Sequence, residues 1–154
     1  MSSSTIACGP CWSVVATVAG VSSMMLHHVS IVATDLARSV AFYRNVFGLE
    51  QIERPPFSTD GAWFACGALQ VHIIINPAGT FRRAATIDTA DGHFAFRTDD
   101  FEGCIRGLIA KGFREDAPDG DPWRLRLRRN GPAGFPQAYL LDPDRNIIEI
   151  NGAP

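Results

Sequence analysis

The sequence predicts an α+β fold made of two tandem β-α-β-β-β modules, and two observations support this. From Leu26 onward the apolar residues switch between the alternation of strands and the wider spacing of helices. In addition, "HVSIVATD" (28–35) is repeated as "HFAFRTDD" (93–100), with histidine first and aspartate last. Such a repeat indicates one supersecondary unit used twice. We expect a domain over 25–154, with module 1 over about 26–77 and module 2 over about 91–152.

The elements of the first module follow from apolar spacing and turn residues. Residues 27–33 alternate as a strand, and residues 35–48 carry apolar side chains at helical spacing. Asp35 suits the N-cap of this helix and Gly48 suits its C-terminal end. Three short extended runs follow, separated by proline and glycine turns: "LEQIER" (49–54), "AWFAC" (62–66) and "LQVHIII" (69–75).

The second module shows the same order. A helix is expected over 101–112, and four extended runs follow it: "FRED" (113–116), "WRLRLRR" (123–129), "FPQAYLLD" (135–142) and "NIIEIN" (146–151). With one helix behind each sheet, one set of strand side chains should pack on the helices: Val29, Ile31, Phe94, Phe96, Ile148 and Ile150.

The composition limits the classes of partner. The chain has 154 residues, enough for one domain with a sizeable core, and a formal net charge of −2. That charge provides no general attraction to nucleic acid or to an anionic membrane. We therefore expect a small-molecule substrate and a second copy of the chain as partners.

The cysteines indicate free thiols. Cys66 and Cys104 sit in apolar patterns, where cysteine behaves as a small hydrophobe, so we expect reduced thiols and a cytoplasmic location. The segment "CGPC" (8–11) copies a thioredoxin-type redox motif. That chemistry needs a strand before the motif, and too few residues precede Cys8 to form one. We interpret the motif as accidental.

Residues 1–24 contain no charged side chain. Their apolar part is shorter than the roughly 18–20 residues that span a bilayer. A signal peptide would start with a basic residue, and the first one here is Arg38. We expect an N-terminal extension appended to the domain, with disorder as one interpretation of it.

Four side chains of metal-ligand type occupy equivalent places in the two modules. His28 and His93 open the first strand of each module, and His72 and Glu149 lie in the last. Because strand side chains alternate between faces, these four should share the face away from the helices, while His27 lies on the helix side or at the frayed strand start. Any one of them alone is better explained as a hydrogen-bonded structural residue, but their joint placement indicates a metal site. Three imidazoles and a carboxylate suit one zinc, nickel, iron or manganese ion with open positions for substrate.

The segments "HHVSIVATDLARSVAFYRNVFGL", "HFAFRTDDFEGCIRGLIAKGF" and "LLDPDRNIIEIN" resemble the vicinal oxygen chelate superfamily over about residues 26–152. This superfamily includes glyoxalases, extradiol dioxygenases, methylmalonyl-CoA epimerases, fosfomycin-resistance enzymes and bleomycin-binding proteins. "DGAW" and the histidine in the following strand resemble its glyoxalase-like branch. The resemblance implies paired modules forming a cup-shaped mixed sheet around a divalent metal. His28, His93 and Glu149 fall on the usual ligand positions, and His72 falls where glyoxalases have a glutamate.

The resemblance implies a metal-dependent lyase or isomerase of the glyoxalase type, in a homodimer. The substrate would chelate the metal through two neighbouring oxygens, the metal would act as a Lewis acid on the developing enediolate, and Glu149 would move the proton. An extradiol-type dioxygenase, a fosfomycin-resistance-type transferase and a non-catalytic binding or resistance protein remain alternatives. A fourth protein ligand would crowd the oxygen or catecholate of a dioxygenase. No basic cluster of the fosfomycin type follows Glu149.

Strand alternation predicts further pocket residues, namely Ser30, Trp63 and Tyr139. Three arginines, Arg124, Arg126 and Arg128, share one face of a strand. They could hold an anionic tail such as glutathione, another acid or a thiol adduct. The alternative is a solvated edge strand whose charges oppose aggregation.

Overall fold

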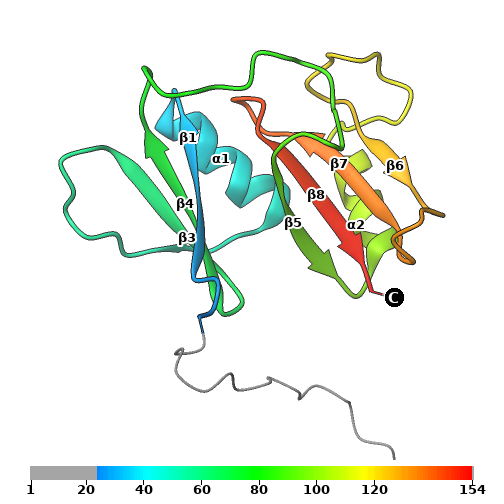
Figure 1. Ribbon diagram of the computed structural model, residues 1–154, viewed down its shortest axis with the longest axis horizontal. Coiled ribbons are helices and arrows are strands. Elements are labelled where there is room, and N and C mark those ends of the chain that lie inside the picture. The colour runs from blue at the N-terminus through cyan, green and yellow to red at the C-terminus, as the bar shows by residue number, and fades with distance from the viewer. Residues whose placement is uncertain (1–23, 154) are drawn as a thin grey trace, which may run out of the picture.

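The computed structural model describes residues 24–153, which form two four-stranded mixed sheets with one helix each (Figure 1). The α+β class and the two tandem β-α-β-β-β modules are confirmed. The "CGPC" motif and nearly all of the expected extension lie outside the described residues. The first module contains β1 (His28–Ala33), α1 (Leu36–Phe47), β2 (Gln51–Ile52), β3 (Gly61–Cys66) and β4 (Leu69–Ile75). The second contains β5 (His93–Thr98), α2 (Phe101–Ala110), β6 (Arg126–Arg128), β7 (Gln137–Leu141) and β8 (Ile147–Gly152).

The first and last strands of each module are neighbours. The first sheet has the order β1-β4-β3-β2, with β1 parallel to β4 and the other pairs antiparallel. The second sheet repeats this as β5-β8-β7-β6, with β5 parallel to β8. This topology places His28 beside the strand of His72, and His93 beside the strand of Glu149.

The helix boundaries follow the predicted capping residues. Asp35 accepts a hydrogen bond from the backbone N–H of Arg38 at 2.9 Å, and Gly48 ends α1 with a φ of +67°. A side chain there would be strained, which explains the glycine. The second helix repeats the cap, because Asp100 accepts from the backbone N–H of Gly103 at 2.8 Å.

Two predicted strands differ from the structure. The run 49–54 keeps only Gln51–Ile52 as a strand, because two prolines follow it and offer no N–H to the sheet. The run 113–116 forms no strand but a single bridge, in which Arg114 lies beside Arg124. The proline-rich turns that come next let the chain pair there only once.

One hydrophobic core joins both modules. It contains α1 and α2 residues and the helix-facing side chains of both sheets, including Ile73, Tyr43 and Leu140, all fully buried. Phe47 of α1 contacts Phe96 of β5, with ring centroids 4.9 Å apart and the rings tilted by 43°, so α1 packs across the module boundary. All the strand residues expected to face the helices belong to this core or pack against it: Val29, Ile31, Phe94, Phe96, Ile148 and Ile150.

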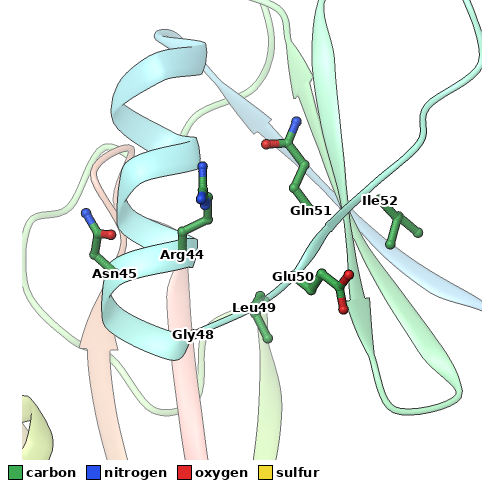
Figure 2. Close-up of a pocket in the computed structure, with 7 residues that line it drawn as sticks. All are labelled: Arg44, Asn45, Gly48, Leu49, Glu50, Gln51 and Ile52. Carbon is green, nitrogen blue, oxygen red and sulfur yellow. The ribbon is translucent and has the colours of Figure 1, made fainter.

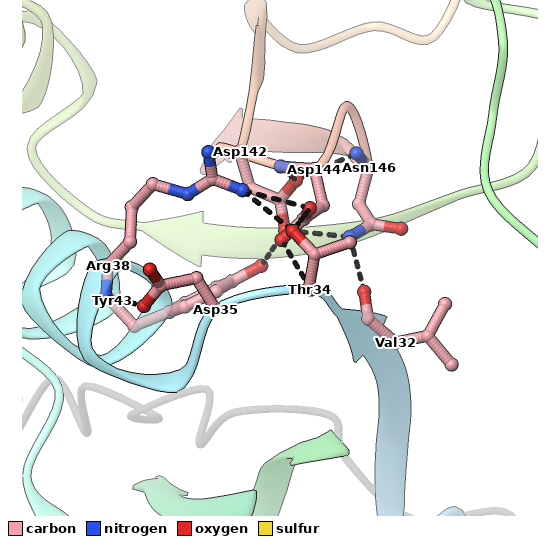
Figure 3. Close-up of polar contacts among 8 residues, drawn as sticks. All are labelled: Val32, Thr34, Asp35, Arg38, Tyr43, Asp142, Asp144 and Asn146. Atoms are coloured by element: carbon pink, nitrogen blue, oxygen red, sulfur yellow. Dashed lines mark hydrogen bonds and ion pairs between the residues drawn. The ribbon is translucent and has the colours of Figure 1, made fainter. Parts of the chain in front are cut away.

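A polar contact ties the turn between β7 and β8 to the first module (Figure 3). Asp144 Oδ1 accepts hydrogen bonds from Thr34 Oγ1 at 2.6 Å and from Arg38 Nη2 at 3.0 Å, and Oδ2 accepts from the Thr34 N–H at 3.2 Å. The Asp144 side chain is nearly buried, whereas that of Arg38 is half exposed. The contact therefore fixes the start of β8 against the end of β1.

A second buried carboxylate supports the same turn. Asp142 accepts hydrogen bonds from Tyr43 Oη at 3.0 Å, from Asn146 Nδ2 at 2.7 Å and from two backbone N–H groups of the turn (Figure 3). Burial raises the pKa of the Asp142 carboxyl, and burial together with the neighbouring Asp142 charge raises the pKa of Tyr43. The family-like segment "DPDRN" thus acts as the connector between modules.

The chain between the modules covers part of the second sheet. Ile87 is buried against Tyr139, Leu141 and Ile147, in a small cluster on the sheet face opposite the helices. Arg126 Nη1 holds this segment by donating to the Ile87 carbonyl at 2.8 Å. Apart from Ala95, the other strand side chains on that face of the second sheet are polar.

Both described cysteines are free and half-buried, and burial raises the pKa of the Cys66 and Cys104 thiols. Within residues 24–153, neither helix has the length and apolar character needed to cross a bilayer.

Candidate metal centre

The front face, defined here as the face of each sheet opposite the helices, carries the predicted ligands. In the first sheet His72 is buried and its ring stacks between two others. The centroid distance is 4.1 Å to Trp63 and 4.1 Å to His28, with interplanar angles of 5° and 14°. Because β1, β4 and β3 are adjacent, the three rings form one continuous stack across the sheet.

The nitrogen atoms of this stack have polar partners. His72 Nε2 lies 2.7 Å from Gln70 Oε1, so Nε2 carries the proton and Nδ1 keeps its lone pair. His27 lies outside β1 and is exposed, but its Nδ1 lies 3.0 Å from His28 Nδ1. His27 is therefore at the strand start and touches His28. Burial, followed by the nearby charges of His28, His27 and Arg54, lowers the pKa of His72, which favours the neutral imidazole that a metal requires.

The second sheet holds the other pair. His93 Nε2 lies 3.0 Å from Glu149 Oε2, and His93 Nδ1 lies 2.7 Å from the Asp91 carbonyl oxygen. A carbonyl can only accept, so Nδ1 must carry a proton. In a neutral imidazole Nε2 then presents a lone pair toward the Glu149 carboxylate. A proton shared between the two atoms, or a cation bound by both groups, would make this contact favourable.

Two side chains hold the other oxygen of Glu149. Tyr139 Oη donates to Oε1 at 3.0 Å, and Gln137 Nε2 donates to the same oxygen at 2.5 Å. Burial and the hydrogen bond to Glu149 raise the pKa of Tyr139, which keeps the phenol as a donor. Glu149 itself is buried, so its orientation is fixed on both sides.

The structure assembles the predicted ligands as two pairs. Within residues 24–153, no three histidine, cysteine or acidic side chains lie close enough together to hold one ion. A cavity of about 360 Å³ runs along β1 and β5, and both Ser30 and His93 line it. Of the four predicted ligands, only His93 lines this cavity.

The donor geometry fits a metal in one pair but not in the other. Adjacent ligands about 2.1 Å from an ion and at about 90° to each other lie about 3.0 Å apart. His93 Nε2 and Glu149 Oε2 show this separation. Imidazole lone pairs lie in the ring plane, so the nearly parallel rings of His28 and His72 cannot aim at one ion. One of these rings must turn before both can bind.

The three predicted arginines are not equivalent. Arg124 donates to the backbone carbonyls of Glu115 and Ala117 and pairs with Asp119, so its guanidinium is committed to a loop. Arg126 donates a hydrogen bond from Nη1 to the Ile87 carbonyl. Arg128 has no hydrogen bond or ion pair within residues 24–153, and it extends from the edge strand β6.

The polar partners of the predicted ligands were not predicted from the sequence. Gln70 precedes His72 by two residues, and Gln137 precedes Tyr139 by two, so each shares the front face with the side chain it supports. This two-residue spacing could have identified both glutamines as neighbours of the candidate ligands. Asp91 acts through its backbone carbonyl, which side-chain patterns do not reveal.

Two other hollows contain none of the predicted ligands. A polar hollow at the end of α1 is formed by the helix and the chain that follows, and Figure 2 shows Arg44 and Asn45 on α1 and Gln51 and Ile52 on that chain. A mostly apolar hollow lies between α1 and the segment after α2, with Phe42 and Trp123 in its lining.

The fold agrees with a family comparison. The Glyoxalase/Bleomycin resistance protein/Dioxygenase superfamily matches residues 25–150. The chain belongs to this superfamily. The resemblance noted in the sequence is thereby confirmed, and it covers both modules.

Relatives of this superfamily member include several glyoxalase-like proteins. "Glyoxylase I 4" of Arabidopsis thaliana is 27% identical over 127 residues, which are 81% of this chain and 68% of the relative. A putative glyoxalase family protein from Bacillus anthracis superposes with a TM-score of 0.68 at 23% identity, over 86% of this chain and 98% of the other. Lactoylglutathione lyase from Agrobacterium tumefaciens gives 0.60 at 22% identity, over 85% and 95%. The structural matches support the fold.

Proposed function

We propose that the protein is a metal-dependent, glyoxalase-like lyase or isomerase, with Glu149 as both ligand and general base. The substrate is a small molecule that chelates through vicinal oxygens. The observation that carries this proposal is the buried Glu149 carboxylate, aligned by Tyr139 and Gln137 on one oxygen and facing His93 with the other. The 27% identity to "Glyoxylase I 4" adds support.

The residues of this chain have distinct roles in that proposal. His28, His72, His93 and Glu149 hold one divalent ion, either zinc, nickel, iron or manganese. When bound, such an ion supplies Lewis-acid polarisation of the substrate oxygens. Glu149 takes the proton from the substrate carbon and returns it to the neighbouring carbon. Tyr139 keeps the carboxylate in one orientation during both transfers.

The two ligand pairs require a partner to become one site. Since each pair provides only two donors, we propose a homodimer in which His28 and His72 of one protomer meet His93 and Glu149 of the other. Two exposed apolar side chains, Met25 and Leu26, lie directly before His27 and add apolar area to such an interface.

Subunit mixing tests this arrangement. His28→Ala and Glu149→Ala proteins should each lose metal. Mixed and refolded together, they form heterodimers in which one site carries both changes and the other carries none. Metal content should then recover to about a quarter of the wild-type sites, as random exchange in a twofold dimer predicts. A site built within one chain would show no recovery.

The reaction class is tested by isotope exchange. The metal-loaded protein is incubated in D₂O with hemithioacetals and small 2-oxo and 2-hydroxy acids, while oxygen uptake is followed in parallel. Deuterium at the product carbon without oxygen uptake is expected. Stoichiometric oxygen consumption with a catechol and no exchange at carbon would favour a dioxygenase. Tight ligand binding without turnover under any metal would favour a binding protein.

A further inference from the structure

We propose that the second sheet carries an oxyanion subsite made by Arg97, Arg128 and Asn151, and that the substrate is therefore a small acid. This inference rests on the proposed function for the position of the reacting carbon. Arg128 is one of the arginines that the sequence suggested for an anionic group, whereas Arg97 and Asn151 are new, and none of the three is a predicted metal ligand.

The subsite is a row of side chains across the sheet. Arg97 of β5 is paired with Asn151 of β8, Asn151 with Gln137 of β7, and Gln137 with Arg128 of β6. Residues in register share a face, and Asn151 has the same parity as Glu149. The row therefore lies on the front face, next to the row that holds Glu149.

The two arginine side chains of this row have no charged partner in the described part of the chain. Within residues 24–153 neither the Arg97 nor the Arg128 side chain makes a hydrogen bond or an ion pair, and both residues are exposed. Arg97 lies with its guanidinium carbon 5.0 Å from the Phe135 ring centroid, which holds the side chain but leaves its N–H groups unused. Arg128 lies in register with Gln137, on the same face as Tyr139. The two arginines thus stand on the two edge strands, at opposite ends of the row.

Asn151 supplies the second observation. Its Oδ1 atom is buried and has no hydrogen-bond partner. A buried acceptor without a partner costs about 1–3 kcal/mol, so native proteins rarely leave one unsatisfied. A hydroxyl of a bound ligand would donate to this oxygen while its anionic group lies between the arginines. A hydroxy acid satisfies both requirements.

The spacing limits the size of the substrate. Asn151 follows Glu149 by two residues, or roughly 6.6 Å along a strand. The anionic group must therefore lie within a few bonds of the carbon from which Glu149 takes the proton. Arg124, which could reach a longer anionic tail, is committed to its own loop. The shared chemistry is an oxyanion, either a carboxylate or a phosphonate.

Binding measurements on the full chain test the subsite. Titration calorimetry uses glycolate, hydroxymethylphosphonate and the neutral glycolamide as probes. The variants are Arg97→Gln, Arg128→Gln and Asn151→Leu, with Arg106→Gln on the exposed side of α2 as the matched control. Thermal melts and metal content verify that each variant is folded and loaded.

The wild type should bind an anionic probe and discriminate against glycolamide. Each arginine variant should weaken the anion by about tenfold or more, as expected for loss of a charge-assisted hydrogen bond. The Asn151→Leu variant should weaken both hydroxylated anions, and Arg106→Gln should change nothing. The probe that binds more tightly distinguishes carboxylate from phosphonate substrates. Equal affinity for glycolamide, no binding of either anion, or unchanged affinity in both arginine variants would overturn the subsite.

The proposed subsite and the proposed reaction can be refuted independently of each other. Charge-selective binding that depends on Arg97 and Arg128, in a protein that exchanges no proton at carbon, keeps the subsite and removes the lyase or isomerase. Proton exchange with neutral substrates, unaffected by the arginine variants, keeps the reaction and removes the subsite.

Discussion

His72 and Glu149 occupy equivalent positions in the two sheets. Ser30, His72 and Trp63 form one row in register, and the corresponding row of the second sheet contains Glu149 between Ala95 and Tyr139. In both rows an aromatic side chain fixes the candidate ligand, by stacking in the first sheet and by a hydrogen bond in the second. The duplication has kept the position and changed the donor.

The Glu149→Gln variant should separate metal binding from proton transfer. Glutamine keeps an oxygen ligand and the shape of the side chain but lacks the basic carboxylate. We expect part of the metal to remain and turnover to fall by about 10²–10⁴-fold, the usual contribution of a general base. Metal analysis and initial rates on one preparation give both numbers. Full activity with full metal content would remove Glu149 from the role of base.

The His72→Glu variant should restore a pair of carboxylates at the two equivalent positions. An oxygen donor in place of an imidazole shifts preference toward harder ions. We expect metal binding to persist with a higher preference for manganese over zinc, measured by competition dialysis. Loss of the stack on Trp63 should also change its fluorescence, and a background with both Trp12→Phe and Trp123→Phe isolates that signal.

Changing His28 should affect the metal far more than changing its neighbour His27. His28 lies on the front face in β1, whereas His27 is exposed before the strand and its ring contacts the His28 ring. Metal content after dialysis should fall strongly in His28→Ala and modestly in His27→Ala. The reverse order would show that β1 presents the other histidine to the site.

The fold was predictable from the sequence because strand parity depends on neighbouring residues and because the repeat is visible in the sequence itself. The alternation that separates Val29 from His28 depends only on local backbone geometry, and it holds in the structure. The caps at Asp35 and Gly48 are equally local. The run at 113–116 misled because its pairing depends on the turns that follow it, which apolar spacing does not record.

The candidate site was only partly predictable, for two physical reasons. Repeat symmetry places His72 and Glu149 correctly in their own sheets, but it does not determine whether the pairs meet within one chain. The commitment of Arg124 to backbone carbonyls arises from tertiary contacts with the loop before it. Sequence alternation grouped it with Arg126 and Arg128, although their surroundings differ.

Removing the contact between the modules should destabilise the whole domain. Asp144 accepts three hydrogen bonds from Thr34 and Arg38, and its side chain is nearly buried. We expect Asp144→Ala to lower the free energy of unfolding by about 1–3 kcal/mol, measured by urea denaturation. The control is Asp119→Ala, whose carboxylate is exposed and pairs with Arg124 at 3.8 Å. That change should stay within about 0.5 kcal/mol. Equal effects would mean that the contact has no special role.

The buried Tyr43 should make stability depend on alkaline pH. Burial and the neighbouring Asp142 raise its pKa in the folded state, so the native protein holds this proton more tightly than the unfolded chain. A group with a raised folded pKa contributes stability that is fully present below its unfolded pKa, near 10, and is lost as the pH rises through the folded pKa. Stability should therefore fall above pH 10 by up to about 1.4 kcal/mol per pH unit from this group alone.

The Tyr43→Phe variant checks that sign. At pH 8 it should be less stable than the wild type by about 1 kcal/mol, because Asp142 loses one hydrogen-bond donor. Between pH 10 and about pH 11.5 its stability should decline less steeply, since no phenol remains to ionise at this position. Tyr139→Phe serves as the comparison, because that phenol is also hydrogen-bonded to a carboxylate but lies outside the main core. Parallel curves for the wild type and Tyr43→Phe would show that Tyr43 ionises equally in both states.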